Sequence, residues 1–202
     1  IAARNEAEMQ SFQQRLESYH NIVVTWLRGN ALELLIAMGV GVLVFLILSW
    51  VKRRAAKIAR ESEQRAELKS IIARTIARTS KFFRIMVAME LVNGYANAPA
   101  AISNTIHVLF TIAAVLQVAI WAREIILGFI ERRAGESMQE SDTLASAMTL
   151  IRLLVSFAVF AIATIVILDN LGVNVTGLVA GLGVGGIAIG LAAQGIFSDL
   201  FA

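Results

Sequence analysis

Residues 175–202 read VTGLVAGLGVGGIAIGLAAQGIFSDLFA, an apolar run that holds half of the chain's 14 glycines. Glycine costs about 1 kcal/mol at an interior helix position, so this density in a helical stretch needs a reason. In lipid, small residues let helix backbones approach closely. Glycines and alanines four apart predict two smooth faces and therefore neighbours on both sides, as in a ring of identical helices. The residues expected to pack are Gly177, Ala180, Gly181, Gly183, Gly186, Ala188 and Gly190.

A ring of such helices would enclose an axis, and two bulky aliphatic residues are placed to line it. Ile187 and Leu191 are four apart and share one face of the helix. Two stacked rings of these side chains would form a narrow constriction that closes a pore by dewetting. Polar residues return at Gln194, and Gly195 weakens the helix there, so a kink is expected at this pair.

The composition indicates an integral membrane protein. Of the 202 residues, 57% are apolar and only 16% are charged, whereas soluble domains carry about 25% charged residues. The chain has no cysteine and only two histidines, His20 and His107, far apart in sequence. This composition excludes disulfides, thiolate metal sites and a cysteine nucleophile, and it argues against a histidine metal site or catalytic triad. We therefore expect neither an enzyme nor a bound metal or cofactor.

Five segments are candidates for membrane spans, which need about 20 mostly apolar residues each. Four are clear from their apolar runs. The weaker fifth, Phe82–Ala101, carries charged and amide side chains and the only proline, Pro99. The four clear spans are Ala31–Val51, Thr105–Ile130, Ser146–Leu171 and Val175–Ala202. The expected fold is thus an all-α membrane protein of about five transmembrane helices, the last lining a pore.

The distribution of basic residues predicts the orientation. Residues 52–84 hold eleven of the chain's 18 lysines and arginines, and such clusters stay cytoplasmic. The N-terminus is then external. If 82–101 spans the membrane, Arg132 and Arg133 also fall inside and the C-terminus is cytoplasmic, so the loop charges favour five spans.

The chain divides into four expected regions. Residues 1–26 form an external helical segment, and 27–104 hold the first two spans with a basic cytoplasmic helical connection. Residues 105–172 hold the next two spans, and 173–202 are the pore-lining helix, cut before a cytoplasmic domain. Both ends of the sequence are interpreted as cuts in a longer chain. Between Lys52 and Lys81 no aromatic residue is present for base stacking, so membrane lipids rather than nucleic acid are the expected partner.

Three arginines near the inner ends of the spans are expected to reach lipid headgroups: Arg84, Arg123 and Arg152. The alternative for Arg152 is a gating ion pair, with Glu124 as the partner. Glu90 lies deeper in its span, and the sequence offers it no obvious partner.

The glycine-rich segment resembles the pore-lining helix of the small-conductance mechanosensitive channels, the MscS family. The residues that carry the resemblance read Ala180-x-x-Gly183-x-x-Gly186-x-Ala188-x-Gly190-Leu191-Ala192-x-Gln194-Gly195-x-x-Ser198-x-Leu200. The resemblance implies a homoheptamer in a bacterial inner membrane, with a gate of two apolar rings at Ile187 and Leu191. It also implies a kink near Gln194 and Gly195. Two positions depart from the family, since Ile187 and Asp199 stand where Leu and Asn are common.

The leading hypothesis is a channel that membrane tension opens, weakly selective for small ions, which relieves hypo-osmotic pressure. An ion-translocating rotor ring is a second hypothesis, because glycine-rich helices also build rotors. A rotor needs a carboxylate at mid-membrane, and the last two spans have none. A secondary transporter is the third hypothesis, and it would need glycine- or proline-broken spans in matching positions of two repeats.

Overall fold

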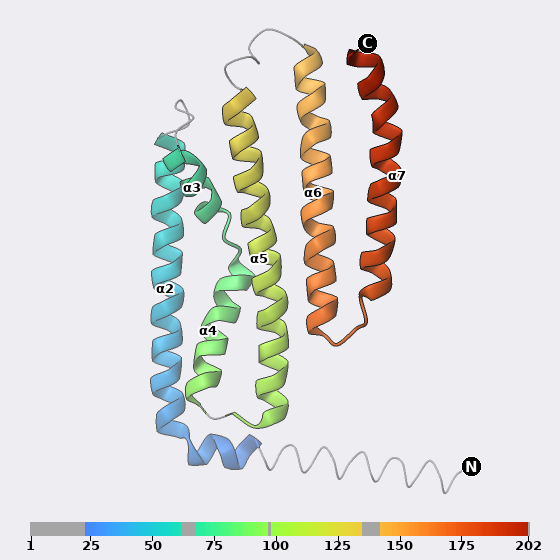
Figure 1. Ribbon diagram of the computed structural model, residues 1–202. Coiled ribbons are helices and arrows are strands. Elements are labelled where there is room, and N and C mark those ends of the chain that lie inside the picture. Colours follow the sequence, from blue (N-terminus) through green and yellow to red (C-terminus); the bar gives the residue numbers. More distant parts are fainter. Residues whose placement is uncertain (1–22, 62–67, 97, 135–141, 202) are drawn as a thin grey trace, which may run out of the picture. The chain divides into compact units, whose positions relative to one another are not determined.

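The protein is described by a computed structural model covering residues 23–61, 68–96, 98–134 and 142–201 (Figure 1). The described residues are helices and short connections, which confirms the all-helical class. Residues 23–29 are helical and precede the first long helix, while the rest of the expected external segment, 1–22, lies outside the described residues. The remaining helices are α2 (Ala31–Glu61), α3 (Leu68–Ala77), α4 (Lys81–Tyr95), α5 (Ala100–Ala134), α6 (Asp142–Asn170) and α7 (Thr176–Phe201).

Three of these helices are long and apolar enough to cross a membrane: α2, α5 and α6. A shorter apolar helical stretch, Thr176–Ala192, belongs to α7. The long helices extend beyond their expected apolar spans. α5 has 35 residues, a length of roughly 52 Å, whereas the hydrocarbon core is about 30 Å thick. Its ends therefore project past the hydrocarbon.

The expected span 82–101 is wrong as a single helix. α4 ends at Tyr95, and a new helix begins after Pro99, whose carbonyl accepts from the Ile102 and Ser103 amides at 2.9 and 3.0 Å. Proline suits a helix start because it lacks an amide hydrogen that would go unpaired there. The 15 residues of α4 rise roughly 22 Å, less than the hydrocarbon thickness. The described residues thus form three long apolar helices, α2, α5 and α6, and the shorter apolar stretch of α7. A fifth crossing by α4 stays a prediction.

Contacts divide the chain into two units, Ile1–Gln117 and Val118–Ala202. In the first unit, α2 packs against both α3 and α4. The helices α2 and α4 approach closely at Gly41, where an added Cβ would lie 2.8 Å from Val92 Cγ2 and 3.3 Å from the Ala88 carbonyl oxygen. Glycine at this position lets the two backbones come together.

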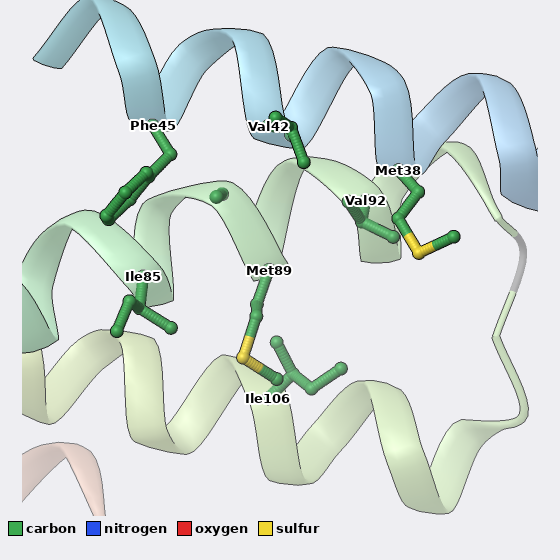
Figure 2. A pocket seen from close by; sticks show the side chains of 9 residues that line it. Met38, Val42, Phe45, Ile85, Met89, Val92 and Ile106 are labelled. Atoms are coloured by element: carbon green, nitrogen blue, oxygen red, sulfur yellow. The ribbon is translucent and has the colours of Figure 1, made fainter. Parts of the chain in front are cut away.

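Beside this crossing lies an apolar pocket of about 420 Å³, lined by residues of α2, α4 and α5 (Figure 2). Figure 2 shows Met89 of α4 directed toward Ile106 of α5, with Phe45 of α2 at one end. All the lining side chains are apolar, as expected for helices that pack within a bilayer. Three polar contacts run along the antiparallel pair α4 and α5 in the same unit, from Ser80 with Gln117, through Glu90 with His107, to Asn93 with Ser103.

The turn between α3 and α4 is held by side chains from three helices. Ser80 caps α4 by accepting from the Phe83 amide at 3.0 Å. The Ser80 amide donates to Gln117 Oε1 of α5 at 2.7 Å, and Lys52 Nζ of α2 donates to the Thr79 carbonyl at 2.7 Å. Gln117 is only 1% exposed. A buried, hydrogen-bonded turn of this kind fixes where the basic helical connection meets the membrane helices.

In the second unit, a short connection joins α6 to α7. Gly172 has φ +79°, a left-handed conformation that suits glycine and ends α6. The Val173 amide donates a hydrogen bond to the Leu168 carbonyl at 3.0 Å. Asn174 Oδ1 accepts from the Thr176 amide at 3.0 Å and begins α7. These hydrogen bonds let the chain reverse its direction between α6 and α7 within a few residues.

Candidate functional site in the glycine-rich helix

α7 is a continuous helix of 26 residues. Every side chain from Thr176 to Ala192 is exposed within the single chain. Ile187, Ile189 and Leu191 are 66%, 73% and 65% exposed. A helix made almost entirely of apolar residues does not remain exposed to water, so α7 must be surrounded by lipid or by further protein.

The glycines of α7 have no packing role within the chain. A Cβ added at any of six described glycines would meet nothing within 4 Å; they are Gly177, Gly181, Gly183, Gly185, Gly186 and Gly190. Ala180 and Ala188, the alanines of the expected packing faces, are exposed as well. Because glycine weakens a helix, six open positions on α7 favour a helix outside the chain that packs against them.

The predicted gate residues occupy one face of this exposed helix. Ile187 and Leu191 are one turn apart, about 6 Å along the axis, and neither contacts a buried core of its own chain. α7 continues through Gln194 and Gly195 to Phe201 without a break in the helix. The gate and the kink therefore stay predictions that concern the assembled protein.

The arginines of the second unit tie α5 to α6. Arg123 Nε donates to Ser156 Oγ at 2.6 Å, and that hydroxyl donates to the Arg152 carbonyl at 2.6 Å. Arg152 Nη2 pairs with Glu131 Oε1 at 2.9 Å. The alternative reading of Arg152 named Glu124 as its ion-pair partner, whereas the structure pairs it with Glu131, two helical turns farther along α5.

The expected lipid contact of Arg84 is wrong. Its side chain lies between α2 and α4 and is only 6% exposed. Arg84 Nη1 donates to Ser49 Oγ at 2.5 Å and Nε to the Ser80 carbonyl at 3.3 Å. The guanidinium carbon is 5.3 Å from the centre of the Phe45 ring. A buried cation with hydrogen bonds and an aromatic face organises the protein interior instead of reaching headgroups.

The polar pair Glu90 and His107 was missed from the sequence. Glu90 Oε1 lies 3.1 Å from His107 Nδ1, across α4 and α5. The two residues are 17 apart in sequence, so only the antiparallel arrangement of these helices brings them together. Among the described residues, no group of three histidines or acids is placed to hold a metal ion.

Comparison with known proteins gives a match to one family model and to one curated relative. Residues 154–194 match the family described as "Mechanosensitive ion channel, transmembrane helices 2/3". The large-conductance mechanosensitive channel MscMJLR of Methanocaldococcus jannaschii is 42% identical over 55 residues, which is 27% of this chain and 15% of that protein. This chain therefore matches only a small part of the curated relative's length. No solved structure matches the chain.

Proposed function

We propose that this chain, whose residues 154–194 match the mechanosensitive ion channel family model, forms a pore that membrane tension opens. The proposed pore is weakly selective and relieves hypo-osmotic pressure by releasing small ions and water. A constriction lined by aliphatic side chains supplies no charged ring or carbonyl cage to discriminate one ion from another.

One observation carries the proposal: α7 is glycine-rich and wholly exposed over Thr176–Ala192. A single chain leaves its glycine faces uncovered, and seven or a similar number of copies would cover both faces of each α7 with the α7 of its neighbours. We take the assembly to be a homoheptamer, as in the family. The packing positions are those named from the sequence, centred on Gly183, Gly186 and Gly190.

In this assembly Ile187 and Leu191 face the axis and form two stacked apolar rings. The closed constriction is too narrow and apolar to hold a continuous column of water. Tension favours the open state because that state occupies more membrane area. The free-energy bias toward opening is set by the difference in membrane area between the two states. A bend at Gln194 and Gly195 would let the inner end of α7 turn away as the ring widens.

The proposed orientation places the N-terminus outside and the C-terminus in the cytoplasm of a bacterial cell, with the protein in the inner membrane. The basic end of α2, from Lys52 onward, and the helix α3 then lie at the cytoplasmic face. Contacts along α4 and α5 support a return crossing by α4, because Ser80 and Asn93, near opposite ends of α4, both contact α5.

The test is patch-clamp recording of the full-length protein in liposomes under graded suction. We expect no current at rest and discrete conductance steps whose open probability rises with suction. Liposomes prepared in parallel without protein are the control. A current that needs an ion gradient or voltage but ignores suction would overturn the proposal, as would the lack of any current.

A further inference from the structure

A second pocket lies between α2 and α3, where the apolar part of α2 ends. Its volume is about 400 Å³. Its walls are mostly aliphatic and come from both helices: Val51 and Ile58 from α2, Ile72 and Ile76 from α3. The walls are therefore suited to a hydrocarbon chain.

Two cations line the same pocket, Arg54 on α2 and Lys69 on α3. Both are exposed, and neither forms an ion pair with a described residue. The Arg54 guanidinium carbon lies 5.2 Å from the centre of the Trp50 ring, which holds the cation beside the pocket. The sequence supplies no acid between Glu33 and Glu61 on α2 and none along α3, so the pocket has a positive rim over an apolar floor.

The position of the pocket along α2 matches the boundary between hydrocarbon and headgroups. Trp50 and Val51 end the apolar run, and Lys52 begins the basic one. Tryptophan favours this interface. The pocket thus begins at this boundary, at Trp50 and Val51, and extends along α2 past Arg54 to Ile58.

We infer that this pocket binds one anionic phospholipid of the cytoplasmic leaflet, with an acyl chain against the aliphatic walls and the phosphate between Arg54 and Lys69. The observation that selects an anionic lipid is the combination of an apolar groove with two cations that form no ion pair with a described residue. The pocket of Figure 2 has no polar lining and selects no headgroup. The inference requires a membrane protein, and it does not require that the protein conduct ions.

The test uses full-length protein in neutral detergent, titrated with fluorescent phosphatidylglycerol, and with phosphatidylcholine of the same chains. The variant R54Q/K69Q removes both rim charges. The control R53Q/R60Q removes two exposed charges of α2 that do not line the pocket. Each basic residue near an anionic headgroup strengthens lipid binding. Because the first variant loses two of them, we expect its phosphatidylglycerol binding to be about thirtyfold weaker. The control should change it little, and phosphatidylcholine should bind weakly to every protein.

The chain-binding half of the inference has its own variant. Ile58 and Ile72 are 48% and 59% exposed, so I58S/I72S removes apolar wall with little effect on folding, checked by circular dichroism. We expect it to weaken phosphatidylglycerol binding severalfold, while soluble glycerol phosphate fails to compete. Equal loss in the two double-charge variants, equal binding of both lipids, or full competition by glycerol phosphate would each overturn the site.

Discussion

Adding a methyl group at Gly41 should wedge α2 away from α4. The new Cβ would lie 2.8 Å from Val92 Cγ2 and 3.3 Å from the Ala88 carbonyl oxygen. Valine is stiff at χ1, and the carbonyl cannot withdraw unless α4 moves. Overpacking of this kind costs about 1–3 kcal/mol. Alanine also favours a helix over glycine by about 1 kcal/mol, which offsets part of that cost.

Gly39 provides the matched control. It lies on the same helix, and an added Cβ there would meet nothing within 4 Å. Gly39→Ala therefore gains the same helix propensity without the clash. Subtracting the two variants cancels the propensity gain, so Gly41→Ala should be less stable than Gly39→Ala by about 1–3 kcal/mol.

The assay is reversible unfolding of the purified protein in mixed micelles, followed by far-UV circular dichroism. Val92→Ala removes the nearer clashing atom and should restore part of the loss in the Gly41→Ala background, which a double-mutant cycle measures. Equal unfolding free energies for the two glycine variants, or no coupling to Val92, would refute the close approach of α2 and α4.

Three other perturbations have defined outcomes. Gly186→Leu should abolish the cross-linked oligomer on denaturing gels, since the open face of α7 would no longer admit a neighbour; an unchanged ladder would show that this face meets lipid. Gln117→Leu leaves the Ser80 amide unpaired in a buried turn and should cost about 1–3 kcal/mol in micelle unfolding, whereas a neutral result would contradict that hydrogen bond. Glu131→Gln should cost less than about 1 kcal/mol, because exposed ion pairs contribute little, and a larger loss would mean that its pair with Arg152 is shielded in the assembly.

The sequence predicted what depends on local pattern. Long apolar runs were enough to identify α2, α5 and α6 as apolar helices of spanning length, and the glycine run identified α7. The resemblance to the mechanosensitive channels also came from that run, because its small residues recur at fixed spacing, and the matched residues 154–194 include most of it. The boundary of α4 was missed, since the apolar pattern continues past Tyr95 and only the Pro99 start of α5 interrupts it.

Contacts between residues far apart in the chain could not be predicted from the sequence. The burial of Arg84 depends on Ser49 and Phe45, which lie on another helix whose facing side cannot be read from periodicity alone. The pairing of Glu90 with His107 likewise requires the antiparallel register of α4 and α5. The proposed gate of Ile187 and Leu191 belongs to neither class, because it would exist only between copies of the chain.

The most direct test of the account is therefore the tension threshold of Leu191→Ser, recorded in liposomes from the full-length protein. A ring of hydroxyls would let water enter the constriction more readily, so the channel should open at lower suction or leak at rest. Ile189→Ser places the same change on the opposite side of α7, since two residues turn the helix by about 200°, and it should leave the threshold near that of the unmodified channel. A Leu191→Ser channel with an unaltered threshold and no resting leak would contradict the proposed gate.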